Sequence, residues 1–152
     1  DLTFPVRSVF VKAACHLLRG GTAGVIGKMR EKVKDAERMR PLVDANTIRG
    51  HAVHIDRYGN VHSNISQQLF KEVGKGRSFI IQFRKASFDI RKINTHYNQV
   101  IDGEMVAIFN HSALLEIAIN RGAEGNGGGA SRLLGLKRND IIRIEFNAGQ
   151  DS

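Results

Sequence analysis

The sequence predicts a mainly β fold, a small antiparallel barrel or sandwich preceded by a helical segment. Over residues 6–18, apolar residues repeat at the spacing of a helix. From Gly50 onward the apolar runs become short and turn residues recur between them, which is typical of short strands joined by hairpins. We therefore expect a helical lead-in over 1–48 and a β domain over 49–152.

The lead-in is expected to contain two helices and a linker. The first helix covers residues 6–18 and ends at the glycine pair that follows it. A second, more polar helix is expected over 22–38, with Pro41 as its limit, because the residue before a proline avoids helical geometry. Residues 42–49 are expected to form a linker. Cys15 lies within the first helix, where a small buried thiol is expected.

The β domain is expected to contain six or more strands and one short helix. Strands are predicted over 51–56, 60–65, 79–83, 87–93, 105–109, 114–119 and 141–146. Residues 66–73 are expected to form the helix, with Ser66 as its N-cap. Gly59 and Asn60 supply a tight turn between the first two strands, since both residue types tolerate positive φ. The glycine-rich segment 122–131 is expected to be a mobile surface loop.

Composition and charge narrow the possible functions. The chain of 152 residues suits about one domain, and 41% hydrophobic with 25% charged residues is an ordinary globular profile. No apolar run approaches the roughly 20 residues of a membrane span. We expect no secretory leader, and a single cysteine fits a reducing compartment, so the expected location is cytoplasmic. The net charge of +8 favours anionic partners, and a basic β-barrel that binds nucleic acid is one alternative function.

The polar turn within residues 55–65 is the most informative segment for function. It contains an acid, an aromatic ring and carboxamides. A pair of strands requires only alternating apolar residues to fold, so folding alone does not explain these side chains. The Asp56 carboxylate suits an ammonium, and the Asn60 carboxamide suits the edge of a purine. Tyr97, in another turn, is placed to stack on a planar ring. The alternative is that Asp56 and Asn60 only hydrogen-bond their own turn.

A second polar turn follows the predicted strand 105–109. His111 and Ser112 lie in it, and such side chains suit a carboxylate or an amino group, although an ordinary hairpin is the alternative. The three histidines of the first hairpin, at positions 51, 54 and 62, are expected to be exposed strand residues. Because strand residues an odd number apart face opposite sides, we expect no metal site there.

Together these segments resemble the S-adenosylmethionine hydroxide adenosyltransferase family, which also includes the fluorinases and chlorinases. The run Ile55–Asn60 with Asn64–Ile65 resembles the signature I-D-x-F-G-N-x-x-T-N-I, and Asn110–Asn120 resembles N-S-x-G-x-L-E-I-A. The segment from Tyr97 to Gly103 is similar to the aromatic turn between these signatures. Thr3–Leu17 resembles the helix T-F-x-G-R-D-x-F-A-P-x-A-A-x-L. Two departures are Ala113, where the signature has glycine, and His111, which replaces a small polar residue.

The resemblance implies a C-terminal β-barrel preceded by the last helix of an α/β N-terminal domain. Members of the family form homotrimers, with each site between the N-terminal domain of one subunit and the C-terminal domain of a neighbour. They attack the ribose 5′ carbon of S-adenosylmethionine with water, which yields adenosine and methionine, or with a halide. A non-catalytic trimerisation domain is a further alternative for this chain.

The resemblance also implies roles for individual residues. Asp56 would hold the methionine ammonium, and Asn60 would bind adenine with Tyr97 packed nearby. His111 and Ser112 would lie near the methionine carboxylate. The full set of expected substrate-binding residues is Asp56, Tyr58, Asn60, Tyr97, His111, Ser112, Asn120 and Arg121, the last two through their backbone near adenine. We expect no catalytic residue within this chain, no metal and no cofactor, with S-adenosylmethionine as the substrate.

Overall fold

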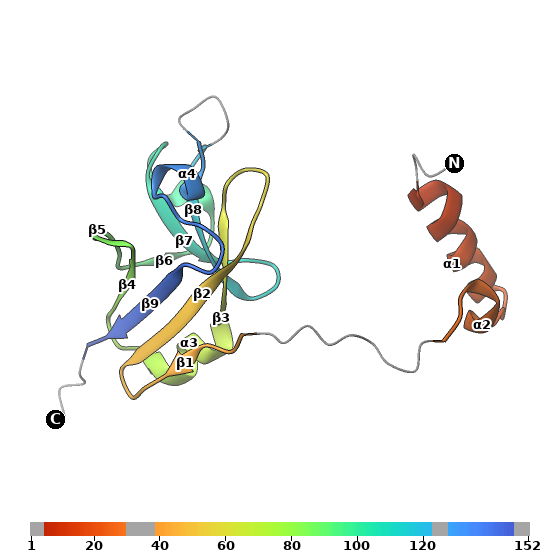
Figure 1. Cartoon of the computed structure of the whole chain (residues 1–152), viewed down its shortest axis with the longest axis horizontal. Coiled ribbons are helices and arrows are strands. Elements are labelled where there is room, and N and C mark those ends of the chain that lie inside the picture. The colour runs from red at the N-terminus through yellow and green to blue at the C-terminus, as the bar shows by residue number, and fades with distance from the viewer. Residues whose placement is uncertain (1–4, 30–38, 123–127, 148–152) are drawn as a thin grey trace. The chain divides into compact units, whose positions relative to one another are not determined.

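The structure is a computed structural model that describes residues 5–29, 39–122 and 128–147 (Figure 1). For residues 85–87 it describes only the backbone. The chain divides into two compact units, Asp1–Glu37 and Arg38–Ser152.

The first unit is helical. A π-helical turn, Val6–Phe10, runs into α1, Val11–Leu18, and a short helix α2 covers Ala23–Ile26. The predicted helix over 6–18 is therefore confirmed. The helix predicted over 22–38 ends early, because Gly27 is extended at φ −165°, and residues 30–38 lie outside the described part of the chain.

The helices of the first unit leave their apolar side chains on the surface. Phe10 is 61% and Leu18 87% exposed, and no described residue of this unit is buried. Cys15 is exposed as well, so the predicted burial of its thiol is wrong. The apolar residues of α1 therefore have no core to pack against among the described residues of their unit. Within the described residues, no helix combines the length and the apolar character that crossing a membrane requires.

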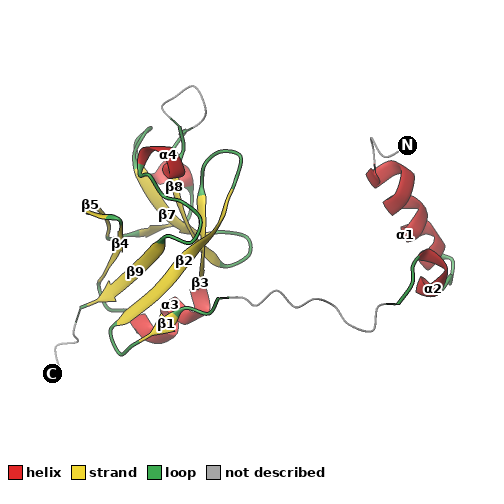
Figure 2. Cartoon of the chain, viewed as in Figure 1, coloured by secondary structure: helices red, strands yellow, loops and turns green. Residues whose placement is uncertain are grey.

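The second unit is a single, mainly antiparallel sheet with two short helices (Figure 2). Its elements are β1 Leu42–Val43, β2 Thr47–Ile55, β3 Val61–Ser66, α3 Gln67–Gly74, β4 Phe79–Phe83, β5 Lys85–Ile90, β6 Ile93–Asn94, the 3₁₀ turn η2 Tyr97–Gln99, β7 Met105–Phe109, β8 Leu114–Ile119, α4 Ala130–Leu133 and β9 Ile141–Phe146. The strand order is β5-β4-β9-β2-β3-β8-β7-β6, with β1 paired to β2. The mainly β fold class predicted from the sequence is confirmed.

The connection between β5 and β6 explains why the sheet curls into a half-barrel. These two strands lie at opposite ends of the strand order. Along the chain, however, only Arg91 and Lys92 separate Ile90 from Ile93. Three residues span at most about 11 Å even when fully extended. The two ends of the sheet must therefore approach each other, and the sheet bends around its core.

Strand β8 is buried on both faces, and this positions the site described below. Leu115, Ile117 and Ile119 point into the main core, with which α3 and α4 also pack. Ala118 points to the opposite face, where it joins a smaller apolar cluster with Val106 and Ile108 of β7. Because side chains alternate along a strand, Glu116 lies on this second face. Glu116 is nevertheless only 2% exposed.

Two predicted boundaries differ from the structure. Residues 42–49, expected to form a linker, contain β1 and the start of β2, with Val43 opposite Ile48. Ile48 is fully buried, so this segment belongs to the β domain. The strand predicted over 87–93 is two strands, since the chain turns the corner between Ile90 and Ile93. The capped helix is confirmed, as the Ser66 hydroxyl accepts a hydrogen bond from the Leu69 N–H at 3.1 Å.

Arg77 ties the end of α3 to the β1–β2 hairpin and to the end of β9. Its guanidinium donates to the Val73 carbonyl at 2.7 Å and to the Asn46 side chain at 2.5 Å. Further bonds reach the carbonyls of Ala45, Gly74 and Asn147. We expect Arg77→Ala to lower the free energy of unfolding by about 1.5–3 kcal/mol, measured by urea denaturation, because several acceptors lose a charged donor.

Arg77→Lys serves as the control for this prediction. Lysine keeps the charge but cannot reproduce a planar fork of donors, so it should recover only part of the lost stability. A lysine variant as stable as the original protein would show that charge alone accounts for the effect.

Candidate functional site

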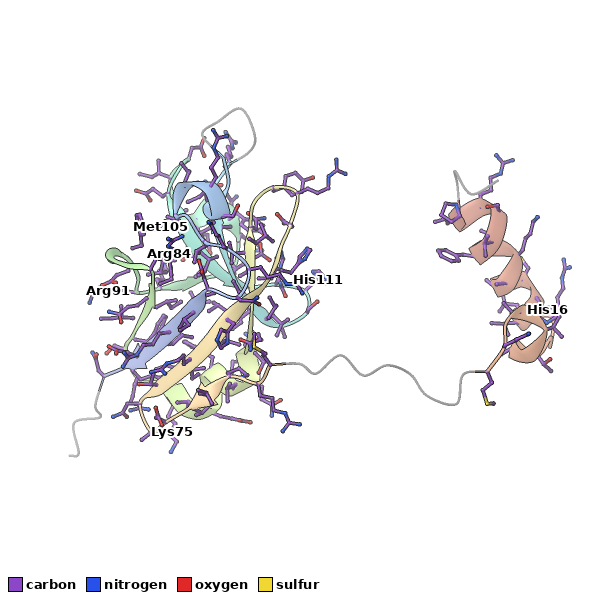
Figure 3. The ribbon with its side chains drawn as sticks, viewed as in Figure 1. His16, Lys75, Arg84, Arg91, Met105 and His111 are labelled. Atoms are coloured by element: carbon purple, nitrogen blue, oxygen red, sulfur yellow. The ribbon has the colours of Figure 1, made fainter. Side chains whose placement is uncertain are left out.

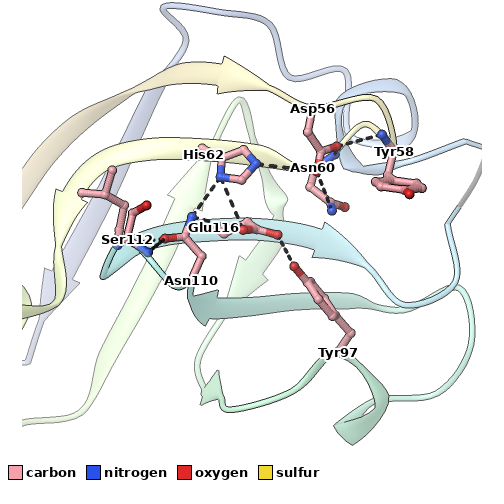
Figure 4. A network of polar contacts seen from close by, with 9 residues as sticks. Asp56, Tyr58, Asn60, His62, Tyr97, Asn110, Ser112 and Glu116 are labelled. Carbon is pink, nitrogen blue, oxygen red and sulfur yellow. Dashed lines mark hydrogen bonds and ion pairs between the residues drawn. The ribbon is translucent and has the colours of Figure 1, made fainter. Parts of the chain in front are cut away.

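The candidate site is built on three turns, which we call the Asp56 turn (56–60), the Tyr97 turn (94–99) and the Asn110 turn (110–113). Sheet register brings the polar residues beneath them into one row. His54 lies opposite His62, His62 opposite Glu116, Glu116 opposite Ile108, and Ile108 opposite Asn94. Partners in register point to the same face. Side chains from five strands therefore lie on one face, and Figure 4 shows the polar contacts of His62 and Glu116 with the three turns.

The Asp56 turn is organised by its own carboxylate. Asp56 Oδ1 accepts hydrogen bonds from the backbone N–H groups of Tyr58, at 2.8 Å, and Asn60, at 2.9 Å. The Asn60 Nδ2 donates to Asp56 Oδ2 at 3.1 Å. Gly59 adopts φ +79°, as predicted, whereas Asn60 is not among the described residues with positive φ. Asp56 and Asn60 thus do hydrogen-bond their own turn, and Asp56 Oδ2 retains capacity for a second donor.

Glu116 connects the other two turns. The Tyr97 hydroxyl donates to Glu116 Oε1 at 2.5 Å, and the Asn110 Nδ2 donates to Glu116 Oε2 at 3.2 Å (Figure 4). Both oxygens of this buried carboxyl group therefore accept hydrogen bonds, the arrangement that an ionised carboxylate requires. Burial, the hydrogen bond to Glu116 and the nearby negative charges of Glu116 and Asp56 raise the pKa of Tyr97 well above its usual range. The phenol is therefore a hydrogen-bond donor at neutral pH.

His62 lies between the two carboxylates. Its Nδ1 is 3.4 Å from Glu116 Oε2 and its Nε2 is 3.7 Å from Asp56 Oδ2. Asn110 Nδ2 lies 2.9 Å from the same Nδ1, which accepts this bond when the imidazole is neutral. Only 19% of the His62 side chain is exposed, so the prediction of an exposed strand histidine is wrong here. The cause is the sheet register, which places His62 opposite Glu116.

The Asn110 turn holds its shape through a side-chain oxygen. Asn110 Oδ1 accepts from the backbone N–H groups of Ser112, at 2.9 Å, and Leu114, at 3.2 Å. These bonds fix the amide orientation, so Nδ2 must face Glu116 and His62. Ala113 adopts φ +55°, a conformation that glycine enters without strain, which accounts for the glycine of the signature at this position. The side chains of His111, labelled in Figure 3, and Ser112 are exposed at the tip of the turn.

Asn120 and Arg121 form a neighbouring cluster at the end of β8. The Asn120 Nδ2 donates to the Val100 carbonyl at 2.7 Å and to Asp102 Oδ1 at 3.2 Å. Arg121 forms an ion pair with Asp102 at 3.1 Å. This cluster holds the chain that follows the Tyr97 turn, and no hydrogen bond between described residues joins it to the Asp56 turn. Tyr58 is 68% exposed.

The segment 128–131 packs directly on the Asp56 turn. The Ser131 N–H donates to the Gly59 carbonyl at 2.8 Å. A Cβ added to Gly129 would lie 2.7 Å from the Gly59 Cα and would collide with the Tyr58 carbonyl oxygen. Ala130 is fully buried, so these residues do not form the predicted surface loop. Residues 123–127 of that predicted loop lie outside the described part of the chain.

Sequence reasoning assigned no role to Glu116, His62 or Asn110. A signal for Glu116 was present, because it is the single charged residue in the apolar strand 114–119. Its partners could not be identified, since they depend on strand register. A hollow of about 590 Å³ borders the Tyr97 turn, of which Asn94 and Gln99 line it. The rest of its lining comes mainly from β5, the connection after it and residues within 100–106, and none of the predicted binding residues lines it. The candidate site is a partly buried polar network that could accept hydrogen bonds from a ligand, with the Tyr97 ring beside it.

The chain as a whole is similar to known proteins in sequence and in fold. A family model described as the SAM hydroxide adenosyltransferase C-terminal domain matches residues 50–143. The (R)-S-adenosyl-L-methionine hydrolase of Thermus thermophilus is 29% identical over 147 residues, which are 95% of this chain and 49% of that protein. The chain spans about half the length of the curated relative it matches.

Two solved structures have a similar fold. The crystal structure of an uncharacterized conserved protein from Thermotoga maritima matches with a TM-score of 0.63 and 26% identity, covering 95% of this chain and 53% of that one. A conserved hypothetical protein from Thermus thermophilus matches with a TM-score of 0.53 and 24% identity, covering 92% of this chain and 52% of that one. The second likeness is one of fold.

Proposed function

We propose, from the premise that this chain belongs to the S-adenosylmethionine hydroxide adenosyltransferase family through its C-terminal domain, that it supplies part of a site that cleaves S-adenosylmethionine. Water would displace the methionine sulfur from the ribose 5′ carbon, which gives adenosine and methionine. The observation that carries this proposal is the family match over residues 50–143, which contains all three turns of the candidate site.

The Asp56 turn offers groups suited to both halves of this substrate. Asp56 Oδ2 receives one bond, from Asn60, and a carboxylate oxygen can accept a further one from the methionine ammonium. Because Asn60 uses its Nδ2 toward Asp56, its Oδ1 remains to accept from the adenine amino group. The Tyr97 ring is positioned by Glu116 and would pack against adenine. His111 and Ser112 would meet the methionine carboxylate, with the backbone at Asn120 and Arg121 near adenine.

The rest of the site would come from other parts of the assembly. The relative that matches is about twice as long as this chain, and the apolar side chains of α1 have no core among the described residues of their own unit. Both facts support an N-terminal α/β domain that covers α1. By the family resemblance, the site would be completed between subunits of a homotrimer. We propose no metal or cofactor for the reaction, since S-adenosylmethionine itself carries the leaving group, and we propose a cytoplasmic location.

The first experiment is to measure the intact mass of the protein from its source, together with any chain that co-purifies. A mass near twice the 16.8 kDa of this chain, or a stoichiometric partner, would support the proposal. That protein should then release adenosine and methionine from S-adenosylmethionine in equal amounts. A 5′-halogenated nucleoside in place of adenosine would identify halide as the nucleophile. A lone 16.8 kDa chain that leaves S-adenosylmethionine intact would contradict the proposal.

Asn60→Ala tests the proposed adenine contact. We expect this substitution to weaken adenosine binding by about 1–3 kcal/mol, measured by calorimetry on the complete protein, because a polar group of the ligand loses its partner. Gln68→Ala, which removes an exposed carboxamide from α3, serves as the control and should leave binding unchanged. Equal affinities for Asn60→Ala and the original protein would remove Asn60 from the site.

A further inference from the structure

Glu116 keeps a negative charge beneath the three turns. It is 2% exposed, and burying a carboxylate is costly unless hydrogen bonds compensate. Its two donors, the Tyr97 hydroxyl and the Asn110 amide, are neutral groups that solvate the charge without cancelling it. His62, at 3.4 Å, provides a cation only when it is protonated. The charge of Glu116 therefore contributes to the potential of the site whenever His62 is neutral.

Asp56 adds a second negative charge on the same face. His62 lies between the two carboxylates, with Nε2 3.7 Å from Asp56 Oδ2. His54 faces His62 with ring centroids 5.5 Å apart, and the phenol of Tyr97 faces Glu116. When both imidazoles are neutral, the two carboxylates leave this network with a net negative charge, although the chain as a whole carries a net charge of +8. Because Glu116 and Asp56 are partly or fully buried, salt screens their attraction to a nearby cation only weakly.

We propose that Glu116 determines the specificity of this site for a cationic ligand. Its charge would favour a sulfonium or ammonium compound over a neutral nucleoside, and its hydrogen bonds hold Tyr97 and the Asn110 turn in position. Glu116 need not touch the ligand, so it is a positioning and charge-bearing residue and not a catalytic one. This inference rests on the proposed function, because it assumes that the three turns face S-adenosylmethionine.

Two substitutions separate the charge of Glu116 from its hydrogen bond. Glu116→Gln removes the charge and nearly preserves the shape, whereas Tyr97→Phe removes the hydroxyl and preserves the charge and the ring. The probes are S-adenosylmethionine, which is cationic, and adenosine, which is neutral. On the complete protein at one pH near 8, the affinity for adenosine is measured by calorimetry and that for S-adenosylmethionine by the KM of its cleavage. Thermal denaturation checks that each variant is folded.

The two variants are expected to behave differently. Glu116→Gln should weaken S-adenosylmethionine binding about tenfold more than adenosine binding, because a cation loses a nearby partner of opposite charge. Tyr97→Phe should weaken both ligands by a similar factor. An unchanged ratio of the two affinities in Glu116→Gln would overturn the inference and leave the proposed function intact. Failure of the original protein to bind either probe would contradict the proposed function and the inference with it.

A spectroscopic titration tests the positioning role without any ligand. The 152 residues of this chain contain two tyrosines and no tryptophan, so in a Tyr58→Phe variant prepared as these residues alone the ultraviolet signal of phenol ionisation belongs to Tyr97. We expect this phenol to ionise above the usual range of a tyrosine, since burial and Glu116 raise its pKa. Adding Glu116→Gln should lower that pKa. An ordinary tyrosine titration in the Tyr58→Phe variant would overturn the positioning role.

Discussion

Replacing Gly129 by alanine should reduce adenosine binding by more than tenfold and destabilise the fold. The added Cβ would lie 2.7 Å from the Gly59 Cα and would collide with the Tyr58 carbonyl oxygen, so backbone would have to move. The Asp56 turn and segment 128–131 would separate, which breaks the bond from Ser131 to Gly59. Inserting atoms into a packed region costs about 1–3 kcal/mol, and more where backbone must shift. Calorimetry and urea denaturation measure the two effects.

Gly24→Ala is the matched control for this substitution. The same methyl group at Gly24, within α2, meets no atom within 4 Å, so binding should be unchanged and stability should not fall. If Gly129→Ala bound adenosine as tightly as Gly24→Ala does, the Asp56 turn would not depend on its contact with segment 128–131.

Ile144→Ala should cause the largest loss of stability. Ile144 is fully buried in β9, opposite Ile48 on one side and Ile81 on the other. Truncating a buried isoleucine removes apolar contacts and leaves a cavity, which costs about 2–5 kcal/mol. That is a large part of the roughly 5–15 kcal/mol by which domains are usually stable. Urea denaturation should show a lower midpoint.

The same strand provides the control. Ile141 is 51% exposed, so Ile141→Ala should cost less than about 1 kcal/mol. Similar losses for the two variants would mean that β9 does not have the inward and outward alternation seen in the structure.

The strands could be predicted because short apolar runs and turn residues are local signals. The runs 79–83, 105–109, 114–119 and 141–146 coincide with β4, β7, β8 and β9. The two-residue strand β1 gave no such signal, because its formation depends on pairing with β2. The burial of Cys15 was predicted from the apolar spacing of its helix. That spacing indicates an apolar face that could pack against another surface, but it does not show that such a surface is present.

The candidate site was only partly predictable for the same reason. Asp56, Asn60 and Tyr97 stood out because they are polar or aromatic residues in turns whose formation does not require such side chains. The structure brings these three together through His62 and Glu116. Neither connecting residue could be chosen from the sequence, since His62 meets Glu116 only through the register of β3 on β8.

The short connection between β5 and β6 also limits how this domain can associate with other chains. A free sheet edge presents unpaired N–H and C=O groups that invite another strand to add to it. Here the two outermost strands of the described sheet are joined by Arg91 and Lys92, and β6 is two residues long. The β6 edge therefore offers little backbone for pairing with another strand, and two cations flank it. At this end of the sheet, assembly should depend on complementary side-chain surfaces and not on the addition of a strand.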